Sequence, residues 1–301
     1  MNELVTEVRL AESQHQQEIL TVESKYNDRT PIDKKLTLSR KSMELKITAS
    51  DRPLTLTPKN ISASNIHQFI KKDHNAWHDL GRGKAILSQP SHLEQYFYSY
   101  GPMISRQWSE LRQPIKLNSG AIDIFDYGCG QGIGTANIFD HLRSGGKPSN
   151  ERPEQRGNVT KGRLDAVRNV NLIEPSAIAL SRAKELLDIY PTNSKLNCVN
   201  KRLNDLTITD LKYMGSSIKV HVFSNILDIG SFDQLALLEK ILSIKGIHCI
   251  AAVSPKNSDG GLRMEDFCTK IVETYIVKSY KKWDLRYKTQ IHNALVAYLE
   301  V

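Results

Sequence analysis

Cysteine is scarce in this sequence, and the pairings on which cysteine chemistry depends are missing. The chain of 301 residues has four cysteines. They are far apart, and none forms a C-x-x-C pair: Cys129, Cys198, Cys249 and Cys268. Zinc sites and disulfide frameworks depend on such close spacings. We therefore expect no metal site and no disulfide.

Long hydrophobic runs are missing as well. No segment approaches the roughly 18 consecutive apolar residues of a membrane span. The first twenty residues include Glu3, Glu7, Arg9 and Glu12, charges that the apolar core of a signal peptide does not contain. The sequence predicts a cytoplasmic protein that is not bound to a membrane.

Positive charge is in excess over negative charge. The net charge is +8 at pH 7, and long-range attraction then favours an anionic partner such as a nucleic acid. The alternative is a solvent-exposed basic surface that binds no partner. The basic residues form two groups, one in residues 143–167 and one near the end of the chain: Arg143, Lys147, Arg152, Arg156, Lys161 and Arg163, and Lys278, Lys281, Lys282, Arg286 and Lys288. Acidic residues interrupt both groups, so the two interpretations stay open.

Residues 1–115 form an extension that we expect to be mainly helical. Residues 3–26 are rich in Glu and Gln with loosely periodic apolar residues. This predicts an exposed helix that packs on a protein partner or frays. Alternating residues at 36–58 indicate a short hairpin. Residues 64–87 and 90–111 predict two helices, broken at glycines and again at Gly101-Pro102.

After the extension, residues 116–301 alternate between apolar strand patterns and amphipathic helix patterns. Strands are expected at 121–127, 170–174, 196–200, 219–224 and 247–253, and helices at 135–142, 177–189, 232–242 and 265–272. Such alternation is typical of a parallel sheet covered by helices on both faces. Residues 273–280 and 289–301 then predict two further strands. The link between them is too short for a helical crossover, so they should pair antiparallel.

Residues 143–167 do not fit this alternation. They are nearly devoid of large apolar side chains, so they cannot bury enough surface to offset their chain entropy. The sequence predicts a mobile basic insertion between the first helix and the second strand of the domain.

The stretch IDIFDYGCGQGIG, residues 122–134, places closely spaced glycines directly after an apolar strand. In open parallel sheets ligands bind beyond the carboxyl ends of the strands. Glycine there permits positive φ and close approach of a ligand to the backbone. Ile133 stands where the dinucleotide pattern G-x-G-x-x-G needs its third glycine, and no lysine follows as in a phosphate-binding loop.

The pattern D-x-G-x-G-x-G, from Asp126 to Gly132, resembles the first motif of class I S-adenosylmethionine-dependent methyltransferases. The segments NLIEPSAIALSRAKELL and VHVFSNILDI resemble later motifs of that family. The resemblance covers about residues 121–301. It implies an α/β fold with a Rossmann-like seven-stranded sheet that ends in an antiparallel hairpin, and S-adenosylmethionine as the cofactor.

The resemblance also implies roles for individual residues. Gly128, Gly130 and Gly132 would lie under the amino-acid part of the cofactor. Asp126 would orient that loop or receive the ammonium group, and Glu174 would accept hydrogen bonds from the ribose hydroxyls. The remaining cofactor residues it implies would lie beside the sulfonium or near the adenine: Phe223, Ser224 and Asn225, and Asn204 and Asp205. The acid that commonly contacts the adenine amino group is missing, because Arg202 stands in its place.

The methyl acceptor is the least determined part of this interpretation. The segment from Ser224 to Asp228 lacks the [DNS]-P-P-[YFW] pattern of nucleic-acid amine methyltransferases. Asp228 is the residue we select as the catalytic base; His221 and His248 are more often simply packed at such strand positions. Tyr98 or Tyr100 would close over the cofactor. Two functions therefore remain. The first is an active methyltransferase whose acceptor is a nucleic acid, a protein or a small molecule. The second is a non-catalytic subunit that binds the cofactor for sensing or assembly.

Overall fold

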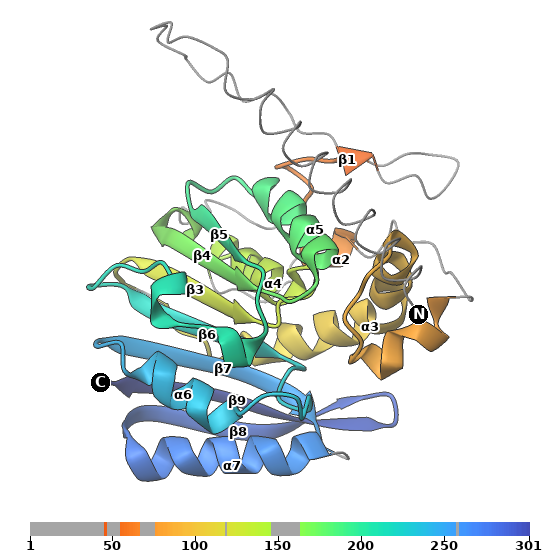
Figure 1. The fold of residues 1–301 in the computed structure, drawn as a ribbon. Helices are drawn as coiled ribbons and strands as arrows, with labels where there is room; N and C mark the ends of the chain where they lie inside the picture. Colours follow the sequence, from red (N-terminus) through yellow and green to blue (C-terminus); the bar gives the residue numbers. More distant parts are fainter. Residues whose placement is uncertain (1–44, 47–54, 67–75, 118, 146–162, 257–258) are drawn as a thin grey trace, which may run out of the picture. The chain divides into compact units, whose positions relative to one another are not determined.

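The alternating apolar segments form one seven-stranded sheet in the computed structural model (Figure 1). The strand order is β5-β4-β3-β6-β7-β9-β8. The bounds are β3 Ile122–Tyr127, β4 Val167–Ile173, β5 Lys195–Val199, β6 Ile218–Ser224, β7 Ile247–Pro255, β8 Ile276–Tyr287 and β9 Gln290–Glu300. β3 to β7 pair in parallel, whereas β9 runs antiparallel to both β7 and β8. This is the α/β fold that the sequence predicts.

The structure describes residues 45–46, 55–66, 76–117, 119–145, 163–256 and 259–301. The exposed helix expected at 3–26 and most of the expected insertion, 146–162, lie outside these residues. Residues Met43–Val301 form one unit. Within the described residues no helix combines the length and apolar character needed to cross a membrane.

Helices cover both faces of the sheet. The main ones are α3 Pro90–Leu111, α4 Ile133–Arg143, α5 Ala177–Asp188, α6 Gln234–Leu242 and α7 Asp259–Thr274. Buried residues of α3, α4 and α5 share one core with Ile122 and Ile124 of β3, whereas α6 and α7 pack with Phe125 and Tyr127. All six residues of β3 are buried, because helices cover it from both sides. The buried face of α3 thus belongs to the sheet's own core, and the boundary at residue 115 stays a prediction.

Short elements complete the described part of the chain. They are β1 Leu45–Lys46, β2 Thr55–Leu56, α2 Ala63–Ile66 and the 3-10 helices η3 His78–Gly83, η5 Arg163–Ala166, η6 Leu203–Asp205 and η7 Ile208–Asp210. β1 and β2 pair antiparallel, as expected of the hairpin in residues 36–58. η5 lies inside the expected basic insertion, where Arg163 donates to the carbonyl oxygens of Leu117 and Gly120.

Three sequence expectations about elements were wrong. The helix expected at 64–87 is replaced, in the described residues, by α2 and η3, with Gly81 and Gly83 at positive φ. α3 continues through Pro102 instead of breaking, because buried residues on both sides of the proline, such as Phe97 and Trp108, pack into the same core. The link expected at 281–288 is mostly strand: β8 runs to Tyr287 because Leu285 is buried against β9, and Lys288 makes the turn at φ 53°.

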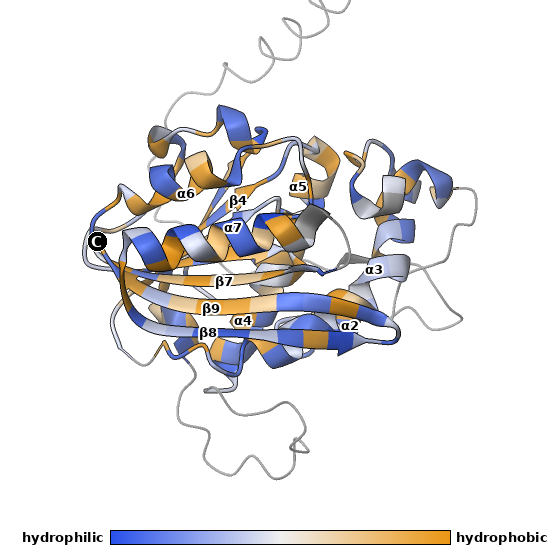
Figure 2. Ribbon diagram, turned by 90° about the horizontal axis from the view of Figure 1, so that it is seen from below, coloured by the Kyte–Doolittle hydropathy of each residue, from blue (hydrophilic) through white to orange (hydrophobic). Residues whose placement is uncertain are grey.

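The outer strand β8 is mostly polar and β9 is apolar along its middle (Figure 2). Lysines at an edge strand discourage pairing with another chain. Two of them form ion pairs within the protein, Lys278 with Glu300 and Lys282 with Glu265.

His221 and His248 lie inside the sheet, as expected of packed histidines, and form a buried hydrogen-bonded chain. His248 Nε2 lies 2.7 Å from the Ile244 carbonyl oxygen, which can only accept, so this nitrogen carries the proton. His248 Nδ1 then accepts from His221 Nε2 at 2.9 Å, and His221 Nδ1 accepts from the Tyr127 hydroxyl at 3.0 Å. These roles hold for neutral rings, and burial lowers the pKa of both imidazoles, that of His248 to about 4, so both are neutral at pH 7.

We expect this pair to make the protein less stable in acid. An unfolded histidine binds a proton near pH 6.5 but folded His248 only near pH 4, so stability falls as pH falls through this window. At pH 5 the loss from His248 is about 2 kcal/mol of unfolding free energy. Urea unfolding of the wild type and His248→Gln at pH 7.5 and pH 5 measures it. The raised pKa of Asp126 makes the folded protein more stable as pH falls, but this effect is the same in both proteins. If the free energy of unfolding falls equally in both proteins between pH 7.5 and pH 5, His248 is not the source of the acid sensitivity.

Candidate functional site

The glycine loop begins where β3 ends and leads into α4. Gly128, Gly130 and Gly132 all have positive φ, at 63°, 52° and 80°. A Cβ on Gly128 would come within 2.4 Å of Ile226 Cδ1, and one on Gly132 within 3.1 Å of Ala183 Cβ. A Cβ on Gly130 would meet no atom of the described residues within 4 Å. Two of the glycines are therefore required by packing inside the protein, whereas Gly130 faces open space.

Asp126, the first residue of the motif, fixes the start of α4. Its Oδ2 accepts hydrogen bonds from Thr135 N at 3.1 Å and Thr135 Oγ1 at 2.7 Å. Oδ1 is buried and has no hydrogen-bond partner in the described part of the chain, and burial raises the pKa of Asp126 to about 7. Of the two roles expected for Asp126, these contacts serve loop orientation; contact with an ammonium group stays a prediction.

Glu174 follows β4 and connects the glycine loop to α5. Its Oε2 accepts from Gly130 N at 3.0 Å, and its Oε1 accepts from Ser176 N at 2.9 Å. Burial raises the pKa of Glu174. Each oxygen of a carboxylate has further acceptor capacity. Glu174 therefore holds Gly130 in place and still offers acceptors to a ligand.

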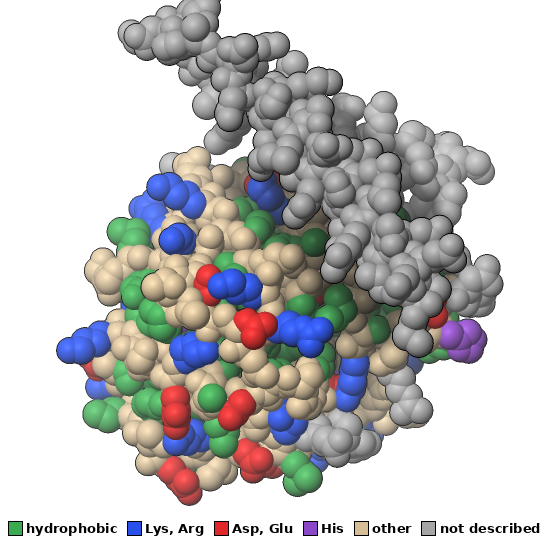
Figure 3. Space-filling model, viewed as in Figure 1, with side chains coloured by type: hydrophobic (Ala, Val, Ile, Leu, Met, Phe, Trp, Pro, Cys, Tyr) green, Lys and Arg blue, Asp and Glu red, His purple; other side chains and the backbone are tan. Residues whose placement is uncertain are grey.

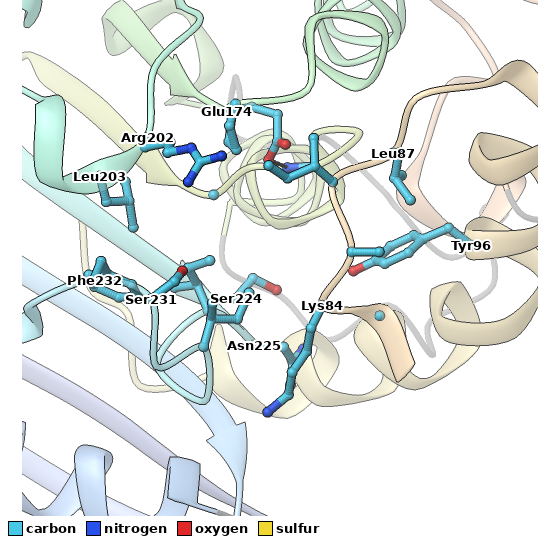
Figure 4. Close-up of a pocket in the computed structure, with 18 residues that line it drawn as sticks. Lys84, Leu87, Tyr96, Glu174, Arg202, Leu203, Ser224, Asn225, Ser231 and Phe232 are labelled. Atoms are coloured by element: carbon cyan, nitrogen blue, oxygen red, sulfur yellow. Dashed lines mark hydrogen bonds between the residues drawn. The ribbon is translucent and has the colours of Figure 1, made fainter. Parts of the chain in front are cut away.

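A cavity opens over Gly130 and Glu174. It lies at the carboxyl ends of β3 to β6, where ligands bind in open parallel sheets. Figure 4 shows Arg202, Leu203 and Phe232 on one side of the cavity, Lys84, Leu87 and Tyr96 on the other, and Glu174 between them. Apolar side chains and a few polar groups from distant segments thus surround one space.

Residues 83–87 line the cavity from the extension. This segment is attached at both ends. Ser176 Oγ, which also caps α5, donates to the Leu87 carbonyl oxygen. Lys84 Nζ donates to the Asp228 carbonyl oxygen at 2.8 Å and lies 3.3 Å from Asp228 Oδ2. The extension is therefore part of the site.

Ser224 and Asn225 line the cavity at the end of β6, as the resemblance implies. Ser224 Oγ accepts from Trp108 Nε1 at 2.9 Å. The Asn225 amide donates to Gln107 Oε1 at 2.8 Å and accepts from Gln107 Nε2 at 3.2 Å. Asn225 has positive φ, 55°. α3 therefore fixes the conformation at the end of β6.

Phe223 does not line the cavity, contrary to the sequence expectation. It is fully buried and stacks on Tyr127, with ring centroids 4.8 Å apart, in the core that faces α6 and α7. Adjacent strand residues point to opposite faces of a sheet, so Ser224 and Phe223 cannot both face the cavity.

Asn204 and Asp205 are exposed and do not line the cavity either, and this expectation is corrected too. Asn204 Nδ2 donates to the Ser231 carbonyl oxygen at 3.2 Å, and Oδ1 accepts from Asp233 N at 3.1 Å. Asn204 thus positions a loop that carries two lining residues, Ser231 and Phe232. Arg202 and Leu203 are the residues of this segment that reach the cavity.

Asp228 lines a second cavity. The two cavities share Gly83, Lys84, Tyr96 and Asn225. Of the two tyrosines proposed from sequence, Tyr100 lines this second cavity and Tyr98 lines neither.

Sequence reasoning missed Tyr96, which lines both cavities. Its spacing of four residues from Tyr100 places the two on one helix face, a signal that would have found it. Lys84, Gln107 and Trp108 carried no such signal.

No protein-family model matches the chain, and no curated protein matches it in sequence. Solved structures similar to it include a SAM-dependent methyltransferase from Leishmania major, 11% identical with TM-score 0.43, covering 74% of this chain and 82% of that one. The N-methyltransferase NodS from Bradyrhizobium japonicum, in complex with S-adenosyl-L-homocysteine, is 10% identical with TM-score 0.43, covering 75% and 98%. A SAM-dependent methyltransferase from Aquifex aeolicus is 12% identical with TM-score 0.42, covering 71% and 100%. Similarity at this level says nothing about what the present chain binds.

Proposed function

We propose that the chain binds S-adenosylmethionine over Gly130 and Glu174 and transfers its methyl group to an acceptor. One observation carries this proposal. Gly130 has positive φ, open space where a side chain would stand, and an N–H bonded to a carboxylate that lines the same cavity. A backbone this bare beside a buried acceptor suits a ligand that has hydroxyl groups and must approach the main chain closely.

The residues present fit this cofactor. Glu174 would accept hydrogen bonds from the ribose hydroxyls, and the apolar side chains of Leu203 and Phe232 would pack on the adenine. Arg202 offers donors to the ring nitrogens in place of the acid that the resemblance implied. Bound there, the cofactor supplies an electrophilic methyl group. The protein contributes position and, for some acceptors, removal of a proton.

The test is methyl transfer from isotopically labelled S-adenosylmethionine, paired with calorimetry of the cofactor and its demethylated product. We expect micromolar-range binding and label in an acceptor. Binding without transfer to any acceptor class would favour the alternative function, a cofactor sensor or assembly subunit. Absence of binding would contradict both.

A nucleic acid as acceptor is a second proposal, supported by the net charge of +8. Charge distribution weighs against it. On the face that Figure 3 shows, acidic and basic side chains are interspersed, and two lysines of β8 are ion-paired.

If a polynucleotide binds along β8, its affinity should fall steeply with salt, by ~0.7–0.9 in the log–log slope for each phosphate contact. Lys281→Glu should lower that slope by about one contact. Lys195→Glu, the same charge reversal at the opposite edge strand β5, should not change it. Fluorescence anisotropy with labelled RNA and DNA measures both slopes. Equal slopes in the two variants would exclude β8 as the contact surface.

A further inference from the structure

The second cavity lies between α3 and the ends of β7 and β9. Its wall includes Tyr96, Tyr100 and Met103 from α3, and Asp228 and His292 from the sheet side. It is adjacent to the cavity over Gly130 and shares lining residues with it. A molecule bound there would lie beside whatever occupies the first cavity.

Two buried polar atoms of residues that line this cavity have no hydrogen-bond partner among the described residues, Asp228 Oδ1 and His292 Nδ1. Asp228 is 8% exposed and His292 is 1% exposed. Buried polar groups are nearly always bonded, and exceptions often have a catalytic or binding role. Two residues that line the cavity thus each carry a solvent-shielded acceptor atom that no described group of the protein satisfies.

The cavity also favours positive charge. Asp228 Oδ2 already contacts an ammonium group of the protein itself, Lys84 Nζ at 3.3 Å. The Lys84 side chain is 43% exposed, so water can solvate its ammonium group when a ligand displaces it, in exchange for the hydrogen bond to the Asp228 carbonyl oxygen. On the α3 side of the cavity the ring centroids of Tyr96 and Tyr100 lie 5.0 Å apart, and the Tyr100 ring stacks on that of Trp77. Aromatic faces attract cations.

From these features we propose that the second cavity is the acceptor site and that it selects a small aromatic amine. The amine binds as an ammonium at Asp228 in place of Lys84 and loses a proton to His292. This inference rests on the proposed function and names its substrate class.

The proton inventory is consistent with this assignment. Burial lowers the pKa of His292, although Asp228 opposes the shift, so the imidazole is neutral near pH 7. Nδ1 takes one proton from the ammonium, and the nitrogen lone pair then forms the bond to the methyl carbon. The carbon–sulfur bond breaks and its electron pair stays on sulfur. His292 returns the proton to solvent, and the product is the N-methylated amine.

The first experiment is calorimetry on protein saturated with the demethylated cofactor. The probes are 2-phenylethylamine and its uncharged counterpart 2-phenylethanol. We expect the amine to bind at least tenfold more tightly than the alcohol. Asp228→Asn should remove this preference, while Asp266→Asn, a matched change at an exposed position on α7, should preserve it. Equal binding of amine and alcohol, or binding of neither at millimolar concentration, would overturn the proposal.

The second experiment separates binding from chemistry. His292→Gln should keep the Kd of both the amine and the demethylated cofactor within about threefold, but lower methyl transfer to the amine by ~10²-fold or more. Unchanged transfer would exclude His292 as the proton acceptor, and label found only in a polynucleotide would overturn the amine assignment. Failure of the demethylated cofactor to bind wild type would instead count against the proposed function.

Discussion

Gly130→Asp should abolish binding of S-adenosylmethionine, with a loss of at least 10³-fold in affinity. The new side chain would enter the open space above Gly130, which the proposal assigns to the cofactor. Its carboxylate would also lie near Glu174, whose Oε2 is bonded to the same residue's N–H, and near the carboxylate of the ligand. Steric overlap and repulsion between like charges act in the same direction. Calorimetry of the wild type and the variant measures the loss.

The matched control is Gly120→Asp. Gly120 also has positive φ, 80°, and an added Cβ there also meets no described atom within 4 Å, but Gly120 does not line the cavity. Both variants therefore carry the backbone strain of a side chain at positive φ, about 1–3 kcal/mol. Thermal unfolding should show similar destabilisation in the two, while only Gly130→Asp loses binding. Equal cofactor affinity in Gly130→Asp and wild type would refute the site.

Glu174→Ala should weaken cofactor binding by about 100-fold. Two hydrogen bonds from hydroxyls to a charged acceptor contribute about 3 kcal/mol together, which corresponds to roughly two orders of magnitude in Kd. The substitution also leaves Gly130 N and Ser176 N without their acceptor, so the loop that must lie under the ligand loses its support. Titration of the demethylated cofactor measures the effect free of any chemistry.

Glu174→Gln distinguishes the loss of hydrogen-bond acceptors for the ligand from the loss of support for the glycine loop. Both carboxylate oxygens accept backbone N–H groups, so an amide NH₂ must face one of these donors, and we expect an affinity between those of the wild type and Glu174→Ala. Glu273→Ala, at an exposed position in α7, is the control for loss of one negative charge. If Glu174→Ala binds as the wild type does, Glu174 has no role in the site.

Local patterns in the sequence were sufficient for the parallel sheet and the loop after its first strand. β3 could be predicted because a strand covered on both faces must be apolar along its length, and IDIFDY is buried throughout. Gly130 and Glu174 could be predicted as neighbours because each ends a strand of the same parallel sheet. The structure brings them to a hydrogen bond of 3.0 Å.

Side-chain direction was harder to infer. Phe223 was assigned to the site from its position in a motif, yet the strand alternation turns it into the opposite core. Asn204 and Asp205 were chosen as polar residues near the adenine, but η6 turns Leu203 inward and leaves both exposed. Such errors are expected when a motif fixes a position along the chain without fixing the face.

The sequence by itself therefore determined the order of strands and helices along the chain, the glycine loop, and Glu174 beside that loop. These features depend on contacts between near neighbours and on the periodicity of strands. Only the tertiary structure decided that Lys84, Tyr96 and Gln107 belong to the site, and that Asp228 and His292 line one cavity. These residues come from a helix, a loop and the last strand. They meet only because β9 inserts antiparallel beside β7 and α3 packs across the strand ends, long-range arrangements that no local pattern records.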